Sequence, residues 1–163
     1  MDLRYALIGC GRISPNHIQS ALKNGLEITA LCDLNTGKAK DLIYDFELSS
    51  EVKIYDDYQE MINENKLDLV AIATDSGSHA KIALDCINEN INLIIEKPIA
   101  LSLKDADAII EESKKRNLVV SPSHQNRFNK SIQKVRESLE NGDFGRLFHG
   151  TAHIRWNRDK SYY

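Results

Sequence analysis

A glycine-rich segment, GCGRIS (residues 9–14), follows the first apolar run of the sequence. Gly9 permits a tight turn, and Gly11 lets the backbone approach a pyrophosphate, whose charge the amides at a helix N-terminus stabilise. Ser14 stands where this fingerprint has its third glycine. Because such a turn can also join a strand to a helix without binding anything, it is the position directly after a strand that favours nucleotide binding.

A carboxylate closes the second apolar run. Asp33 follows Ser14 by 19 residues, where an acidic side chain accepts hydrogen bonds from the hydroxyls of an adenosine ribose. A phosphate on that ribose would meet a like charge, and Lys38 and Lys40 are the only close cations in the sequence. The pattern predicts NAD in preference to NADP. The alternative is that Asp33 caps the helix that follows.

Lys97 is the best catalytic candidate. It stands in the triplet Glu96-Lys97-Pro98, directly after the apolar run NLII. An ammonium at such a position can orient a substrate hydroxyl and stabilise its oxygen while a hydride leaves the carbon. The alternative is a surface ion pair between Glu96 and a neighbouring cation, which would have no functional meaning.

Two further polar segments follow apolar runs. In TDSGSH (residues 74–79) the small residues, Thr74 among them, would admit a cofactor, whereas His79 either faces that cofactor or lies in the first turn of a helix. The segment QNR (residues 125–127) offers donors for a polar ligand such as a sugar or a carboxylate. A polar junction between domains would explain it equally well.

Other kinds of chemistry find little support. The histidines form no HExxH motif and the three cysteines are far apart, so no metal site is predicted. Neither a GxSxG elbow nor a Walker A motif occurs. A formal net charge of -3 gives no broad attraction for nucleic acid. Without a signal peptide or a run near the ~18 apolar residues of a membrane span, we expect a cytoplasmic protein with no membrane partner.

Alternating elements must position these residues. Apolar runs of strand length lie at 5–9, 26–33, 68–74, 92–96 and 118–123, and helices are expected near 15–24, 35–47, 57–65, 77–90 and 102–116. Asp56 is the start signal expected for the third of these helices, and Ser102 with Asp105 resembles a capping box at the fifth. The runs are continuously apolar, which is typical of parallel strands covered on both faces. The sequence therefore predicts an α/β fold with a doubly wound parallel Rossmann sheet, whose ligands bind at the carboxyl ends of the strands.

The alternation of strands and helices does not continue after residue 123. We expect an NAD-binding Rossmann domain over 1–123 and the truncated beginning of a second α/β domain, for substrate and oligomerisation, over 124–163. In that second part a helix of about 15 residues and an alternating strand over 147–156 are predicted. Since nothing remains to pair with that strand, the sequence suggests a chain that ends as a second domain begins.

The motifs together resemble those of the Gfo/Idh/MocA oxidoreductase family. GCGRIS near the start, Asp33 after the second run, the EKP triplet at 96–98 and the Asn126-Arg127 pair occur in family order. The resemblance covers essentially the whole chain, and family members run to about twice this length. It implies an NAD-dependent enzyme that forms a homo-oligomer through its second domain. Asp75 departs from the family pattern, in which many members carry proline.

The resemblance also implies roles for individual residues. Lys97 would be the catalytic or substrate-orienting lysine, and substrate would further contact Asn126 and Arg127. The family's acid/base histidine would lie beyond Tyr163. The NAD site would be lined by Gly9, Gly11, Arg12, Ile13, Asp33, Thr74, His79, Glu96, Lys97 and Gln125.

The expected function is hydride transfer between NAD and a hydroxyl-bearing carbon of a sugar or nucleotide sugar. The tail segments HQNRFNKSIQ, GDFGRLF and RWNRDKSYY resemble a family branch that oxidises the 3-hydroxyl of UDP-N-acetylglucosaminuronic acid. The alternative is a non-catalytic sensor of NAD or sugar on the same scaffold. Residues 1–163 alone are predicted to bind NAD weakly and to turn over nothing.

Overall fold

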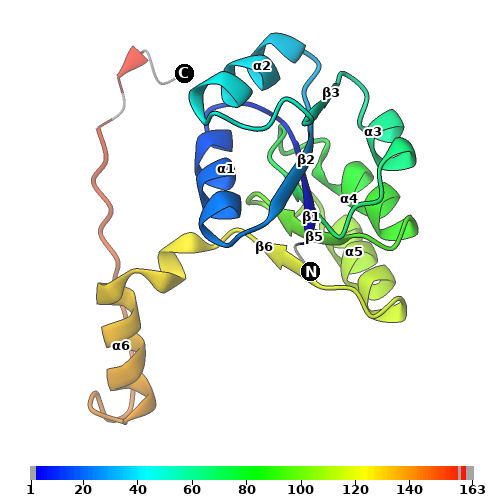
Figure 1. The fold of residues 1–163 in the computed structure, drawn as a ribbon. Coiled ribbons are helices and arrows are strands. Elements are labelled where there is room, and N and C mark those ends of the chain that lie inside the picture. The colour runs from blue at the N-terminus through cyan, green and yellow to red at the C-terminus, as the bar shows by residue number, and fades with distance from the viewer. Residues whose placement is uncertain (1–2, 158, 161–163) are drawn as a thin grey trace. The chain divides into compact units, whose positions relative to one another are not determined.

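The chain divides into two compact units, Met1–Ser123 and His124–Tyr163. The structure is a computed structural model that describes residues 3–157 and 159–160, and Figure 1 traces their elements. The unit boundary coincides with the boundary expected between the two domains. The functions expected for the two parts remain predictions.

A parallel sheet forms the centre of the first unit. Its strand order is β3-β2-β1-β4-β5-β6 and every neighbouring pair is parallel. The chain therefore winds outward from β1 in one direction and then from β4 in the other, which confirms the doubly wound α/β prediction. The strands are β1 (Arg4–Ile8), β2 (Glu27–Cys32), β3 (Lys53–Tyr55), β4 (Leu69–Ile72), β5 (Asn92–Ile95) and β6 (Val120–Pro122).

Helices cover both faces of this sheet. They are α1 (Ser14–Lys23), α2 (Thr36–Asp45), α3 (Tyr58–Glu64), α4 (His79–Asn88) and α5 (Leu103–Lys115). Figure 1 shows α1 and α2 on one face and α3, α4 and α5 on the other. No helix in the described part of the chain is long and apolar enough to cross a membrane.

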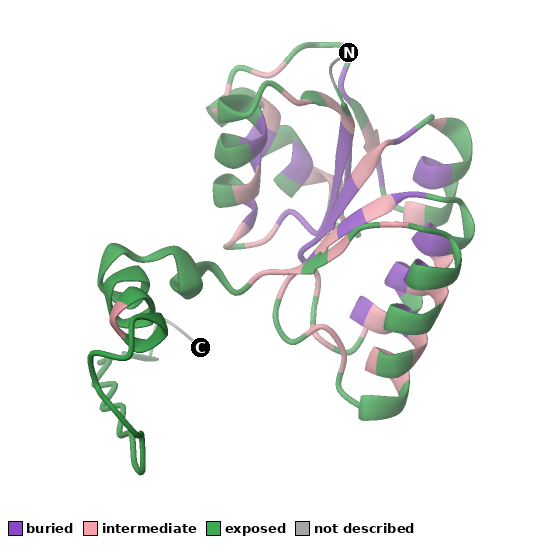
Figure 2. Ribbon diagram, turned by 90° about the horizontal axis from the view of Figure 1, so that it is seen from below, coloured by how far each residue is buried: buried purple, intermediate pink, exposed green. Residues whose placement is uncertain are grey.

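The two faces explain why the strands are continuously apolar. In β1, Ala6 and Ile8 pack into the core beneath α3, α4 and α5, whereas Tyr5 and Leu7 pack into the core beneath α1 and α2. Successive side chains of a strand point to opposite faces, so both sets are buried. Figure 2 shows this burial along the strands and on the inward sides of the helices.

Two details differ from the sequence prediction. The strand β3 has only three residues, KIY, and is too short to stand out as an apolar run. Asp57, not Asp56, caps α3, and its side chain accepts a hydrogen bond from the Gln59 amide. At α5 the predicted cap is present, because Ser102 Oγ accepts from the Asp105 amide at 3.1 Å.

The second unit contains a 3-10 helix, η1 (Gln125–Phe128), and one α-helix, α6 (Lys130–Glu140). The helix α6 has 11 residues. The strand predicted over 147–156 is wrong, because these residues form no strand in the structure. A strand needs a neighbour to receive its backbone hydrogen bonds, and the described part of this unit holds no other strand.

Candidate functional site

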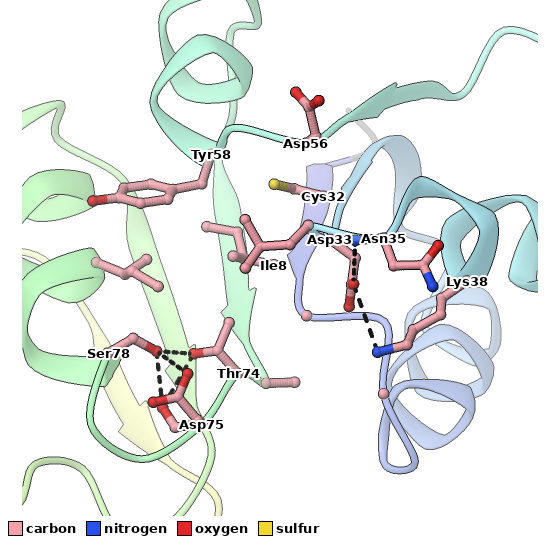
Figure 3. Close-up of a pocket in the computed structure, with 15 residues that line it drawn as sticks. Ile8, Cys32, Asp33, Asn35, Lys38, Asp56, Tyr58, Thr74, Asp75 and Ser78 are labelled. Atoms are coloured by element: carbon pink, nitrogen blue, oxygen red, sulfur yellow. Dashed lines mark hydrogen bonds and ion pairs between the residues drawn. The ribbon is translucent and has the colours of Figure 1, made fainter.

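A cavity of about 480 Å³ opens where the carboxyl ends of β1, β2 and β4 meet. This is the point at which the strand order reverses, where ligands bind in open α/β sheets. Of the predicted site residues, Gly9, Gly11, Asp33 and Thr74 line it. Figure 3 shows Asp33, Asn35 and Lys38 opposite Thr74, Asp75 and Ser78 across the opening.

The two glycines serve different purposes. Gly9 has φ of 96°, and a Cβ there would lie 2.6 Å from the carbonyl carbon and oxygen of Ala73. Only glycine therefore fits between the ends of β1 and β4. At Gly11, by contrast, a Cβ would meet no atom within 4 Å. Because Gly11 lines the cavity, its missing side chain leaves room for a ligand to approach the backbone.

Asp33 is held rigidly at the edge of this space. Its Oδ2 accepts from the Cys10 amide at 2.8 Å and its Oδ1 from the Asn35 amide at 2.9 Å. Lys38 Nζ lies 3.7 Å from Oδ1, and a dashed line in Figure 3 marks this ion pair. A carboxylate offers about four acceptor positions, so positions remain for hydroxyl donors. The helix cap is Asn35, whose side chain accepts from Gly37, and Asp33 is not itself the cap.

The opposite wall is the turn into α4. Ser78 Oγ lies 2.8 Å from Thr74 Oγ1 and 3.1 Å from Asp75 Oδ1, while Asp75 Oδ2 accepts from the Gly77 amide at 3.1 Å. These short contacts fix the loop (Figure 3). Asp75, the departure from the family pattern, therefore supports the turn through its side chain.

Two cysteines lie beside the cavity, and their thiols are unreactive. Cys32 lines it, and Cys10 belongs to the glycine-rich turn. Burial, followed by the nearby carboxylates, raises the pKa of each thiol to about 12. Both are protonated at neutral pH, and a protonated thiol is a poor nucleophile.

The segment that carries Lys97 lies directly after β5. The Glu96 amide donates to the Ile72 carbonyl at 2.9 Å, and the Glu96 carboxylate lies 3.0 Å from His17 Nε2. The Glu96 side chain does have a partner, but that partner is a histidine of α1, and both side chains are mostly buried. Lys97 itself is exposed. The Lys97–Pro98 peptide bond is cis.

His79 is buried, with 1% of its surface exposed. Its Nδ1 lies 2.7 Å from the Pro98 carbonyl oxygen and its Nε2 3.1 Å from the Thr74 carbonyl oxygen. It begins α4, as the alternative of a first-turn position expected. Its predicted contact with the cofactor remains a prediction.

Other predicted site residues lie outside the described cavity lining. Arg12 is exposed and Ile13 is half-buried at the start of α1. In the second unit, Gln125, Asn126 and Arg127 are exposed residues of η1.

Several lining residues were missed by sequence reasoning. Leu34, which is 93% exposed, directly follows Asp33, and this adjacency is a usable signal. The sequence indicated Lys38 only as a cation near Asp33, and Asp56 only as a helix cap. Tyr58 begins α3 after the short strand β3, and recognising that strand would have brought Tyr58 and Asp56 to the same sheet edge. Among the described residues, no group of three or more His, Cys, Asp or Glu could hold a metal ion.

Comparison with known sequences assigns this geometry to a family. A profile of the oxidoreductase family with an NAD-binding Rossmann fold, Gfo/Idh/MocA, matches residues 3–124. The chain belongs to this family. The resemblance predicted from the motifs and NAD as the cofactor are thereby confirmed.

Relatives of the Gfo/Idh/MocA chain include dehydrogenases of inositol and of D-apiose. Inositol 2-dehydrogenase of Salmonella typhimurium is 28% identical over 92% of this chain and 46% of its own length. D-apiose dehydrogenase of Paraburkholderia graminis is 31% identical over 92% of this chain and 40% of its own. The chain thus spans less than half the length of these relatives.

A solved structure supports the fold assignment. The WlbA dehydrogenase from Bordetella pertussis, in complex with NADH and UDP-GlcNAcA, matches with a TM-score of 0.79 and 27% identity. The match covers 91% of this chain and 45% of that one. The Gfo/Idh/MocA chain is therefore similar to less than half of a dehydrogenase crystallised with both NADH and UDP-GlcNAcA.

Proposed function

We propose that this chain supplies the cofactor-binding part of a dehydrogenase that moves a hydride between NAD and a hydroxyl-bearing carbon of a sugar or nucleotide sugar. One observation carries the proposal: the Asp33 carboxylate, fixed by two amides, borders the open space above Gly11. A dinucleotide needs this pairing of an acceptor for its ribose with a bare backbone for its pyrophosphate.

Different residues of the cavity would bind different parts of the cofactor. Asp33 accepts the ribose hydroxyls with its remaining lone pairs, and Gly11 admits the pyrophosphate to the start of α1. Thr74 covers the opposite side. Further contacts are proposed for Arg12, Ile13, His79, Glu96, Lys97 and Gln125, as the family resemblance implies.

Lys97 would act on the substrate. NAD, when bound, supplies a hydride acceptor at its nicotinamide ring. The exposed ammonium of Lys97 orients the substrate hydroxyl and stabilises the negative charge that grows on its oxygen as the hydride leaves the carbon. Asn126 and Arg127 offer donors for further hydroxyls or a carboxylate. The base that takes the hydroxyl proton would lie outside residues 1–163, and a homo-oligomer would form through that further part.

The substrate class follows from the relatives. Two are dehydrogenases of inositol and of D-apiose, and a structural neighbour holds UDP-GlcNAcA. All three ligands carry several secondary or ring hydroxyls. Within this class we propose a nucleotide sugar oxidised at C3, because the tail segments after residue 123 resemble that branch.

The test is NADH formation by the complete gene product against a panel of inositols, free sugars and UDP-sugars. We expect turnover on at least one UDP-sugar, and its loss in Lys97→Ala with NAD binding retained. Residues 1–163 alone are expected to bind NAD without turnover. Saturable NAD binding with no turnover by the complete gene product on any substrate would instead support a non-catalytic sensor.

A further inference from the structure

Two histidines contact the segment that carries Lys97, one on either side of it. His17 comes from α1, and His79 begins α4. Lys97 itself makes no hydrogen bond or ion pair with any residue that the structure describes. The lysine is therefore free to act, while its neighbours in the chain are fixed.

His79 joins this segment to the wall of the cofactor cavity. Its two ring nitrogens face the carbonyl oxygens of Pro98 and Thr74, at 2.7 and 3.1 Å. A carbonyl oxygen only accepts, so a neutral ring donates to one of them and a doubly protonated ring donates to both. With 1% of its surface exposed, His79 has little access to solvent, and water does not compete with these contacts.

His17 holds the other side. Its Nε2 lies 3.0 Å from Glu96 Oε1, and the two side chains are 11% and 13% exposed. The Glu96 amide is bound to β4 through Ile72. Glu96 is thus held at its backbone by the sheet and at its carboxylate by the helix that follows the glycine-rich turn.

We propose that His17 and His79 are positioning residues that hold the backbone at Lys97 in place relative to the cofactor cavity. The proposal rests on the proposed role of Lys97 in hydride transfer. A lysine side chain has many rotamers, and a catalytic group works only within a narrow range of positions. An exposed lysine between two anchored neighbours meets both conditions, because its ammonium can move while its Cα cannot.

Matched variants separate the hydrogen bonds from the bulk of each ring. In His17→Gln the amide nitrogen stands where Nε2 stood and can still donate to Glu96, whereas His17→Leu cannot. In His79→Asn the amide nitrogen replaces Nδ1 and can still donate to Pro98, whereas His79→Leu cannot. His153→Leu, at an exposed histidine of the second unit, controls for the loss of an imidazole as such.

The primary readout is the backbone order parameter of the Lys97 amide, measured by 15N relaxation on the chain itself. We expect a rigid value of about 0.85 in the wild type, in the Gln and Asn variants and in His153→Leu. We expect a fall to below about 0.6 in both Leu variants. The Ile72 and Ile95 amides, within β4 and β5, serve as internal references and should not change.

Rigid Lys97 amides in both Leu variants would overturn the proposal, even if thermal stability falls. Flexible Lys97 amides in all four histidine variants alike would also overturn it, since the conservative side chains would then fail to rescue. If His79→Leu does not fold, the order parameters of the Lys97 amide in His17→Leu, His17→Gln and His79→Asn still test the proposal.

This readout needs neither cofactor nor substrate, so its failure is distinguishable from failure of the proposed function. In the complete gene product, both Leu variants should lower kcat about 10-fold or more, and His17→Leu, which lies outside the proposed cofactor contacts, should leave KM for NAD within about twofold. Flexible Lys97 amides with unchanged kcat would contradict the catalytic role of Lys97 and leave the positioning intact. Unchanged amides with lowered kcat would contradict the positioning.

Discussion

The amino edge of the sheet, where the strands begin, and the carboxyl edge, where they end, use polar side chains in opposite ways. At the amino edge, where β1 and β4 begin, Asp68 accepts from the Arg4 amide at 2.9 Å and from Arg4 Nε and Nη2 at 2.8 Å each. The Arg4 guanidinium holds the pKa of the Asp68 carboxyl well below its usual range. The guanidinium and the carboxylate are bound directly to each other.

At the carboxyl edge, the comparable carboxylate is only partly bound. Asp33 accepts from two backbone amides, and its cationic neighbour Lys38 lies 3.7 Å away with 51% of its side chain exposed. Glycine at position 11 leaves the adjacent space open. The difference teaches that a charge paired in full stabilises the fold, whereas one fixed in place with acceptor positions left over can bind a ligand.

The largest expected effect is at Lys97. Lys97→Ala should lower kcat on the order of 10³-fold, because no other group would stabilise charge on the substrate oxygen. Thermal stability should not change, since the ammonium has no partner among the described residues. Steady-state rates and thermal unfolding of the complete gene product check both parts. A kcat within threefold of wild type would remove Lys97 from the mechanism.

The next largest effect is expected for Gly9→Ala, which should lower the stability of the fold. The new Cβ would lie 2.6 Å from the Ala73 carbonyl at a φ of 96°, so the ends of β1 and β4 must separate or the turn must change. We expect a loss of about 3 kcal/mol in the free energy of unfolding, measured by urea denaturation. A loss below about 0.5 kcal/mol would show that the turn relaxes without strain.

Asp33→Asn should weaken NAD binding roughly 10- to 100-fold, because hydrogen bonds to a charged acceptor contribute about 1.5–3 kcal/mol. Asp33→Ser with an arginine introduced nearby should raise the preference for NADP over NAD. Titration calorimetry with both cofactors provides the affinities. An unchanged NAD to NADP ratio in the second variant would contradict the role of Asp33 at the ribose.

The smallest effect is expected at the amino edge. Asp68→Asn should cost about 1 kcal/mol of stability, since the ion pair is partly exposed, and should leave NAD affinity unchanged. Because the folded pKa of Asp68 is lowered, this contribution is complete above the ordinary pKa of about 3.9 and is lost as pH falls toward the folded pKa. Unfolding curves of both proteins should therefore converge in acid. A gap that persists at low pH would contradict the assignment.

Much of this arrangement could be predicted from the sequence because it depends on local patterns. Continuous apolar runs predicted the parallel sheet, and GCGRIS and Asp33 stand at strand ends, where chain order alone brings them to one edge. The strand β3 was missed because three residues carry too little periodicity. The strand over 147–156 was wrong because alternation is not sufficient without a partner strand.

The contacts between distant segments could not be predicted. Nothing in the spacing of His17 and Glu96 indicates that they pair across 79 residues of sequence. The same holds for His79, for which the family resemblance implies a cofactor contact and whose two ring nitrogens lie against backbone carbonyls. Such pairs depend on which helix packs over which strand, and a single sequence does not specify that at the level of atoms.

The most direct test of the account is calorimetric titration of NAD into this chain as the wild type, Gly11→Leu and Asp68→Asn. A Cβ at position 11 would meet no atom within 4 Å, so we expect leucine there to fill the open space beside Asp33, with stability retained and affinity for NAD lowered at least about 10-fold. Asp68→Asn, at the other edge, should bind as the wild type does. Equal affinity in all three proteins, or no saturable binding by the wild type, would contradict the claim that the carboxyl edge is the NAD site.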